Sequence, residues 1–428
     1  MLPTPSHTAH TKPATALMLS GGGARAAYQV GVLEAIADIR KSAGALHSGN
    51  PFPILTGTSA GAINAAALAC GADDFDAAVR SIAKVWRHFN VSQVYRADAV
   101  SMLRSGASWM TLLSVGWVIA KWRRLKPRSL LDNSPLAALL QELVPLQRLP
   151  YLIRSGDVQA LAVTASSYGS GEHVTFFQGD KRLKHWLRSQ RIAVRDKITL
   201  DHLLASSAIP FIFPATALGI HGRTEYFGDG SMRQSAPISP AIHLGAERIL
   251  VIGAGRMHEP KDEGRQPNGS YPSLAQIAGH ALSSIFLDAL AVDIERVRRI
   301  NQTMALVPPE ARSGSALRPV ELLVISPSER LDSMAARHVG DLPAPVRTLL
   351  GAVGVSPSSG DVKGAALASY LLFESSYTGD LMALGYADAQ KQHGEICQFF
   401  GWDVSRISDA PVPAPPPPER RRDPLRLR

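Results

Sequence analysis

The chain has 428 residues, of which 45% are hydrophobic and 19% are charged, so it can bury a sizeable core and is not a mostly disordered protein. It has two cysteines, Cys70 and Cys397, which excludes a disulfide framework and a cysteine zinc site. The formal net charge of +9 suits an anionic partner, nucleic acid or anionic lipid, and composition by itself does not choose between them.

The expected elements begin after a flexible N-terminus, residues 1–14, which lacks the apolar stretch of a secretory signal. Short apolar runs predict strands at 16–20, 53–56, 160–165, 173–177, 248–252 and 320–326. Helical patterns lie between several of them, at 24–39, 60–70 and 75–89. This alternation predicts an α/β fold with a buried, mostly parallel sheet covered by helices. No continuous apolar run reaches the length of a membrane span.

A glycine-rich loop follows the first expected strand directly. It contains Gly21, Gly22 and Gly23, with Arg25 just behind them at the start of a helix. The N–H groups of such a loop can converge beside a helix N-terminus and bind a phosphate or a transient oxyanion. The spacing also fits a loose dinucleotide-binding fingerprint, but the second strand ends without the acidic residue that would hold a ribose. A tight turn for helix–strand packing is the third interpretation.

A second pattern is the pentapeptide Gly57-Thr58-Ser59-Ala60-Gly61, between a strand and an alanine-rich helix. A serine on a sharp strand-to-helix turn projects its hydroxyl out of the sheet, and Gly57 and Gly61 allow the close approach that this turn requires. Chance matches to the pattern are common. The strand before it, the helix after it and the glycine loop one unit earlier favour Ser59 as a nucleophile.

A third pattern places Asp229 between two glycines, Gly228 and Gly230. Such a segment is often only a turn. A serine nucleophile nevertheless needs a base, and a carboxylate on a glycine-flanked loop can approach its hydroxyl closely. The acidic cluster at 73–76 is a poorer source of that base, because we expect it to cap the helix that begins near Phe75.

Residues 109–128 combine an apolar stretch with tryptophans and a basic end. The stretch is too short to cross a bilayer. Two interpretations stay open, a core helix with a solvated basic end and a membrane-facing insertion; tryptophans at the interface and cations near anionic head groups favour the second. The candidate membrane-binding residues are Trp109, Trp117, Trp122, Lys121, Arg123 and Arg124.

The remaining chain divides into two parts. We expect residues 251–407 to form a mostly helical extension packed on the same unit. Residues 408–428 are rich in proline and arginine and predict a disordered tail. Five arginines against two acids at 411–428 give the tail +3 of the net +9. The rest of the chain is only moderately basic and shows no nucleic-acid reader motif, so we expect no nucleic-acid partner.

Together these motifs resemble the patatin-like phospholipases, in particular the bacterial branch of that family. The matching segments are 16–35, 57–66, 205–216 and 228–246, with further similarity at 284–301 and 369–389. The resemblance implies a three-layer α/β/α fold with a mostly parallel central sheet and a catalytic domain at 15–250. The chain departs from the family pattern in having Ala26 in place of a glycine and Ser231 in place of a glycine or alanine.

The resemblance also implies an activity: hydrolysis of acyl esters in lipids, as by a phospholipase A or a lysophospholipase. In that family a serine and an aspartate act without histidine. Ser59 would then be the nucleophile and Asp229 the base, and Gly21, Gly22 and Gly23 with Arg25 would line the oxyanion loop. We expect no metal and no cofactor, a lipid or acyl-ester substrate, and a cytoplasmic protein able to associate with the inner face of the membrane.

Two other functions stay open at this point. The first is a Ser-His-Asp esterase of the α/β-hydrolase type, because several histidines follow Asp229: His243, His258, His280, His338 and His393. Against it, Ser59 comes very early in the chain for that fold. The second is a catalytically weak membrane-binding scaffold on a patatin-like fold, which Ala26 and Ser231 keep open.

Overall fold

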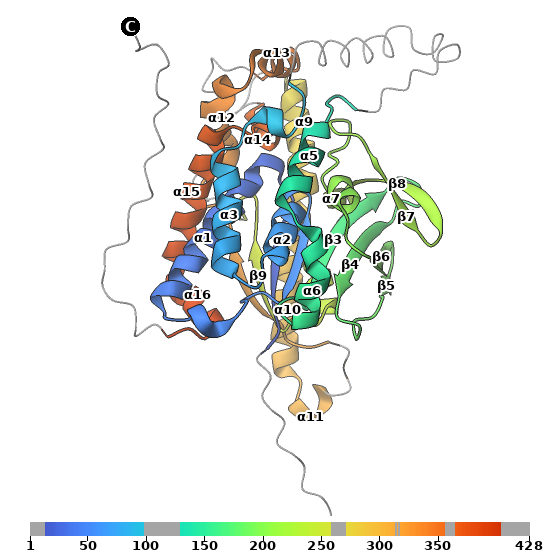
Figure 1. The fold of residues 1–428 in the computed structure, drawn as a ribbon, viewed down its shortest axis with the longest axis vertical. Coiled ribbons are helices and arrows are strands. Elements are labelled where there is room, and N and C mark those ends of the chain that lie inside the picture. Colours follow the sequence, from blue (N-terminus) through green and yellow to red (C-terminus); the bar gives the residue numbers. More distant parts are fainter. Residues whose placement is uncertain are drawn as a thin grey trace, which may run out of the picture.

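The computed structural model describes residues 13–97, 129–257, 271–312, 315, 317–355 and 364–403 (Figure 1). Its centre is a ten-stranded mixed sheet with the order β10-β9-β1-β2-β3-β4-β6-β5, in which β8 also pairs with β3, and β7 with β8. The strands are β1 (Thr15–Leu19), β2 (Ile54–Thr58), β3 (Ala160–Ser167), β4 (His173–Gly179), β5 (Leu187–Arg188), β6 (Arg191–Arg195), β7 (Thr216–Ile220), β8 (Arg223–Asp229), β9 (Arg248–Ile252) and β10 (Glu321–Ile325).

The five neighbouring strands from β10 to β3 are all parallel, which confirms the expected parallel centre of the sheet. All six strands predicted from apolar runs are present within a few residues of the expected bounds. The sequence did not predict β5 to β8. Three of these, β5, β7 and β8, have exposed residues along much of their length, so they lack the continuous apolar run of a buried strand.

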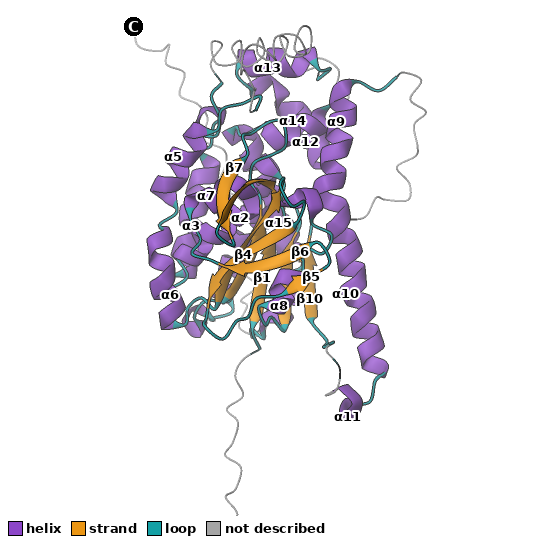
Figure 2. Cartoon of the chain, turned by 90° about the vertical axis from the view of Figure 1, so that its right-hand side faces the viewer, coloured by secondary structure: helices purple, strands orange, loops and turns teal. Residues whose placement is uncertain are grey.

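The sheet is sandwiched between two layers of helices because its parallel strands are apolar on both faces. In β1, Leu17 and Leu19 belong to one hydrophobic core, and Ala16 and Met18 belong to the other. Figure 2 shows the sheet between α10 on one side and α3, α5 and α6 on the other. This arrangement is the expected three-layer α/β/α fold.

The first core is covered by helices from both ends of the chain. They are α1 (Ala27–Ser42), α2 (Ala60–Cys70), α3 (Phe75–Arg87), α5 (Ser134–Leu143), α6 (Leu149–Ser155), α7 (Leu200–Ser206), α9 (Leu274–Ser283), α12 (Leu331–His338), α13 (Ala344–Ala352), α14 (Ala365–Leu371), α15 (Ser375–Lys391) and α16 (His393–Phe400). The second core is covered by α8 (Ser239–His243) and α10 (Ala289–Leu306). A short α11 (Pro309–Arg312) follows α10.

Helices α9 and α10 are joined without a break by a π-helical turn, η6 (Ser284–Asp288). The resulting helix is long and apolar enough to cross a membrane by length and composition. Polar residues interrupt its apolar ones, so no continuous apolar run marks this helix in the sequence. Leu290, Ile294 and Val297 pack in the second core, and 33% of the most apolar window of this helix is buried.

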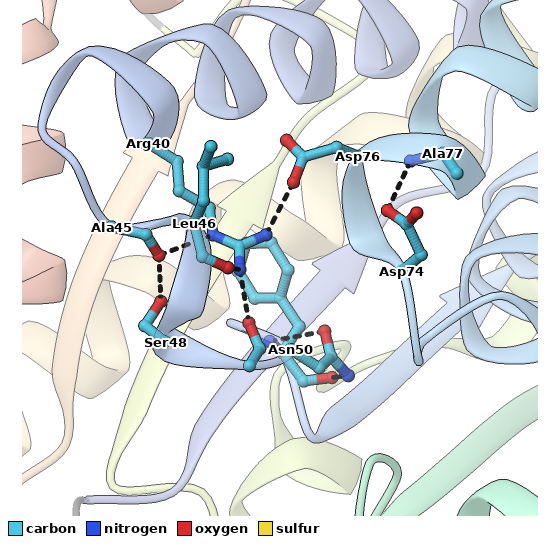
Figure 3. Close-up of polar contacts among 10 residues, drawn as sticks. Arg40, Ala45, Leu46, Ser48, Asn50, Asp74, Asp76 and Ala77 are labelled. Carbon is cyan, nitrogen blue, oxygen red and sulfur yellow. Dashed lines mark hydrogen bonds and ion pairs between the residues drawn. The ribbon is translucent and has the colours of Figure 1, made fainter.

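A buried arginine fixes the connection between α1 and the start of β2 (Figure 3). Arg40 is 3% exposed; its Nη1 pairs with Oδ2 of Asp76 at 3.0 Å, and its Nη2 donates to the carbonyl oxygen of Leu46 at 2.8 Å. Asp74 accepts a hydrogen bond from the N–H of Ala77 at 2.9 Å and caps α3. The expected capping role of this acidic cluster is therefore confirmed at Asp74.

Candidate active site

Ser59 occupies the turn between β2 and α2 and is 1% exposed. Its φ of 56° and ψ of −134° lie in a region that side chains rarely adopt. Such strain costs roughly 1–3 kcal/mol and persists only where the surroundings enforce it. Here the N–H of Ser59 donates to Oγ of Ser206 at 2.9 Å. The turn therefore holds the Ser59 side chain in a fixed position at the start of α2.

The two glycines that flank this turn have no room for a side chain. A methyl group on Gly57 would lie 2.5 Å from the carbonyl oxygen of Gly61 and 2.6 Å from Cα of Ala62. A methyl group on Gly61 would lie 2.5 Å from the carbonyl oxygens of Leu19 and Ser20. The turn is thus packed against itself and against the end of β1, which brings Ser59 close to the glycine loop that follows that strand.

The glycine loop, Gly21 to Gly23, is buried. Gly23 has a φ of 54°, and a methyl group there would collide with the carbonyl oxygen of Tyr370. Within the described residues the N–H groups of Gly22 and Gly23 donate to no protein acceptor. Buried N–H groups without an acceptor are rare in proteins. Gly23 lines the same cavity as Ser59, which places the glycine loop beside any group bound there.

Arg25 follows the glycine loop, and its guanidinium contacts α14. Its Nε donates to Oγ of Ser369 at 2.8 Å, and its Cζ lies 4.1 Å from the ring centroid of Tyr370. Arg25 is 4% exposed. Its side chain therefore joins the loop to the C-terminal helices.

Asp229 is the last residue of β8 and lies opposite Ala165 of β3. One strand, β2, separates β3 from β1, the strand that leads into the glycine loop. Its side chain is fully buried. Oδ1 accepts a hydrogen bond from the N–H of Ser231 at 2.9 Å. Oδ2 has no hydrogen-bond partner among the described residues. One carboxylate oxygen is thus held and the other is free.

Burial raises the pKa of Asp229 to about 6. Hydrogen bonding from the Ser59 hydroxyl, and from the N–H and hydroxyl of Ser231, acts against this rise and lowers the pKa. These two hydroxyls do not meet full hydrogen-bond geometry, since Oδ2 of Asp229 and Oγ of Ser231 are both without a partner. Ser59 and Ser231 are thus close neighbours of the carboxyl group. A carboxylate with a pKa near 6 is a better base than an exposed one.

Several polar residues that support the site were not singled out from the sequence. The hydroxyls of Thr58 and Thr164 lie 2.7 Å apart, and Nε2 of Gln234 donates to Oγ1 of Thr58 at 2.8 Å. All three side chains are buried. They tie β2 to β3 and to the segment after Asp229. Ser206, which accepts from Ser59, falls in the 205–216 segment that carried part of the family resemblance but had no role assigned.

The two departures from the family pattern fit the structure differently. Ala26 has a φ of −66°, a helical value that alanine adopts without strain. Ser231 is 5% exposed, and its Oγ lies 2.5 Å from the position that a methyl group on Gly21 would occupy. The extra hydroxyl of Ser231 is therefore packed between the glycine loop and the Asp229 carboxyl.

An apolar cavity with a volume of about 80 Å³ is lined in part by Ser59. Its walls come from α2, α3, α5 and the segment after α7, and Ala60, Ile63 and Ala67 of α2 follow Ser59 along one side. The other wall residues include Ile82, Val85, Trp86, Phe89, Leu136, Leu139, Leu140, Leu143, Ile209, Phe213 and Phe373. An apolar lining of this kind suits a hydrocarbon chain.

In the described part of the chain, no histidine hydrogen-bonds to Ser59 or to Asp229. His338 is bound to Asp341 and Asp380, at 3.1 and 2.9 Å, and His243 stacks on Trp186. His258 lies outside the described residues.

Other residues singled out from the sequence cannot be placed. The tail at 408–428 lies outside the part of the chain that the structure describes. So do the candidate membrane-binding residues, which are Trp109, Trp117, Trp122, Lys121, Arg123 and Arg124.

Comparison with known proteins shows which family the chain belongs to. No curated protein matches the chain. Among solved structures, VipD from Legionella pneumophila is 13% identical with a TM-score of 0.32, over 90% of this chain and 67% of VipD. Human GIVD cytosolic phospholipase A2 is 12% identical with a TM-score of 0.42, over 92% of this chain and 60% of the human chain. These likenesses are too distant to carry an argument about function.

The family itself rests on the sequence profile described as patatin-like phospholipase, which matches residues 17–242, more than half of the chain. The matched range includes the glycine loop, Ser59 and Asp229. The chain belongs to the patatin-like phospholipase family.

Proposed function

We propose that this protein is a serine acyl-ester hydrolase of lipid substrates, of the phospholipase A or lysophospholipase type, that uses a Ser59–Asp229 dyad. Membership of the family supports lipid hydrolase activity. The observation that carries the finer proposal is the buried carboxyl of Asp229, with one free oxygen, beside a strained serine at the mouth of an apolar cavity. The motifs at 16–35 and 228–246 further support placement in the bacterial branch.

In the first half of the proposed reaction, Asp229 takes the proton of the Ser59 hydroxyl as Oγ attacks the ester carbonyl. The free N–H groups of Gly22 and Gly23 donate to the oxyanion, and each such donor is worth roughly 3–4 kcal/mol in the transition state. The tetrahedral intermediate collapses, the proton passes from Asp229 to the leaving alcohol, and Ser59 is left acylated. The acyl chain lies in the apolar cavity along α2.

In the second half, Asp229 removes a proton from water, which attacks the acyl carbonyl. Collapse of the second intermediate returns the proton to Oγ of Ser59 and releases the fatty acid. Every proton transfer goes through one carboxylate, so the proposal requires no histidine.

A fluorophosphonate probe tests this proposal directly, because it reacts with an activated serine. We expect the wild-type protein to be labelled and Ser59→Ala not to be. The surface variant Ser155→Ala should be labelled like the wild type. Labelling that survives in folded Ser59→Ala would assign the nucleophile elsewhere. A wild-type protein that neither reacts with the probe nor hydrolyses esters would favour the scaffold function.

The pKa of Asp229 gives a pH prediction. The carboxyl must be ionised to accept the Ser59 proton, so kcat/KM should fall as the pH drops below about 6. In Ser231→Ala the midpoint of this fall should move slightly to higher pH, because the hydroxyl beside the carboxyl group, which lowers its pKa, is gone. The measurement is a pH–rate profile on a soluble ester, with Ser155→Ala as the control. A midpoint that stays in place in Ser231→Ala would contradict this role of the hydroxyl.

We also propose peripheral association of a cytoplasmic protein with anionic membranes through residues 109–128. The support is the sequence alone: tryptophans around an apolar stretch, followed by cations that each contribute roughly 1 kcal/mol near anionic lipid. In co-sedimentation, the wild type should bind anionic vesicles less as salt increases. A variant with Lys121, Arg123 and Arg124 changed to glutamine should bind more weakly. Equal binding by the two proteins would refute the proposal.

A further inference from the structure

The glycine loop is enclosed by parts of the chain that lie beyond the family-matched residues 17–242. On one side, a methyl group on Gly23 would collide with the carbonyl oxygen of Tyr370 in α14. On the other, a methyl group on Gly21 would lie 2.9 Å from Cδ1 of Phe286 in η6. The C-terminal helices thus touch the loop at both of its ends.

The side chains that make these contacts are stacked on one another. The rings of Phe286 and Tyr370 have centroids 5.0 Å apart and an interplanar angle of 26°. The guanidinium of Arg25 lies over the Tyr370 ring, with its Cζ 4.1 Å from the ring centroid. The contacts therefore run from Gly21 to Phe286, from Phe286 to Tyr370, and from Tyr370 to Arg25, which comes just after the glycine loop.

Tyr370 is also the main partner of a buried charge. Arg25 is 4% exposed and has no ion pair among the described residues; its side chain donates to the Ser369 hydroxyl and lies over the Tyr370 ring, and its charge also acts on Tyr377. Burial of an uncompensated charge is unfavourable, and an aromatic face is one of the few uncharged groups that attract a guanidinium. The position of Arg25, and of the loop before it, therefore depends on Tyr370.

The π-helical turn accounts for the position of Phe286. A single π-helical turn inserts one residue into a helix and rotates the side chains after it, and such turns recur at functional sites. Here the turn lies between α9, whose buried residues face the first core, and α10, whose buried residues face the second. Phe286 is 5% exposed and is the one residue of the turn that packs fully into the first core.

We propose that Phe286 and Tyr370 are positioning residues that hold the glycine loop in its place beside the cavity at Ser59. The C-terminal helices are then part of the active-site framework. The catalytic consequence rests on the proposed function, in which the N–H groups of the loop stabilise the oxyanion. The structural consequence, an ordered loop, does not rest on the proposed function.

The test compares Phe286→Leu and Tyr370→Leu with two controls. Tyr370→Phe keeps the ring under Arg25, and Phe399→Leu changes an equally buried phenylalanine in α16 that does not touch the loop. For a soluble short-chain ester, we expect kcat to fall about tenfold or more in the first two variants, with KM within about twofold of the wild type, because oxyanion donors act mainly in the transition state. Both controls should keep kcat within about twofold.

Amide hydrogen exchange of the 16–30 segment provides a second, independent readout. Exchange should be faster in Phe286→Leu and Tyr370→Leu and unchanged in the two controls. Unchanged exchange in both of the folded leucine variants would overturn the proposal, as would an equal loss of kcat in Phe399→Leu. If the wild type showed no Ser59-dependent turnover, the proposed function would fail, and the exchange measurement would still decide whether Phe286 and Tyr370 order the loop.

Discussion

Asp229→Asn is expected to lower kcat for a soluble ester by roughly 10²–10⁴-fold, the usual cost of losing a general base. Ser59→Ala should reduce hydrolysis to near background. The double variant should be no worse than Ser59→Ala, because two groups that act as one unit are strongly non-additive. Steady-state kinetics on a soluble short-chain ester measures all three.

The stability of Asp229→Asn should change in the opposite direction to its activity. A carboxyl group whose pKa is raised to about 6 binds its proton more tightly in the folded protein than in the unfolded chain. Its ionisation therefore costs folding free energy above pH 4, and the full cost, roughly 3 kcal/mol, is reached above pH 6. Asparagine carries no charge and can still accept from the N–H of Ser231. Asp229→Asn should therefore melt at a higher temperature than the wild type at pH 7.

The matched control is Asp157→Asn, at an aspartate just before β3 that accepts a hydrogen bond from the exposed Ser155. It should leave both kcat and the melting temperature close to wild-type values. Substantial activity in folded Asp229→Asn would mean that another group is the base. The histidines would then be the first candidates, including His258 outside the described residues.

Ala67→Phe is expected to change chain-length preference more than any other single substitution in the cavity. Ala67 lies eight residues after Ser59 and lines the same cavity, roughly 12 Å along α2. A phenyl ring there would block the far end and exclude the last few methylenes of a long chain. Each excluded methylene costs about 0.8 kcal/mol, so kcat/KM for a palmitoyl ester should fall about 100-fold.

The same variant should hydrolyse a butyryl ester nearly as fast as the wild type, because a short chain ends before Ala67. The ratio of the two esters is therefore the measurement, and it is independent of protein concentration and of partial unfolding. As a control, Leu46→Ala changes an exposed apolar residue away from the cavity and should leave the ratio unchanged. An unchanged ratio in Ala67→Phe would place the acyl chain elsewhere.

The two ends of the chain contribute different parts of the candidate active site. The part of the chain up to Asp229 supplies the reactive groups at the ends of β1, β2 and β8. The C-terminal half supplies Phe286, Tyr370 and Phe373, which pack on those turns or line the cavity. Helix α15 packs against α1 (Figure 1), and α14 contacts the glycine loop through Tyr370.

The sequence by itself determined the local features of this protein. Strands β1, β2 and β9 could be located because they are apolar runs buried along almost their whole length, and the edge strand β10 because it is also an apolar run. Gly57, Ser59 and Gly61 could be recognised because a strand-to-helix turn imposes its requirements on consecutive residues. The glycine loop was recognisable for the same reason.

Only the tertiary structure decided how these segments combine. Asp229 reaches the site because β8 runs antiparallel to β3, and β8 has no apolar run that would reveal this pairing. The raised pKa of Asp229 comes from burial by residues distant in sequence, and the contacts of Gly21 and Gly23 with Phe286 and Tyr370 span more than 250 residues. Periodicity and motif spacing report on neighbours along the chain, whereas desolvation and stacking depend on which faces of separate elements meet.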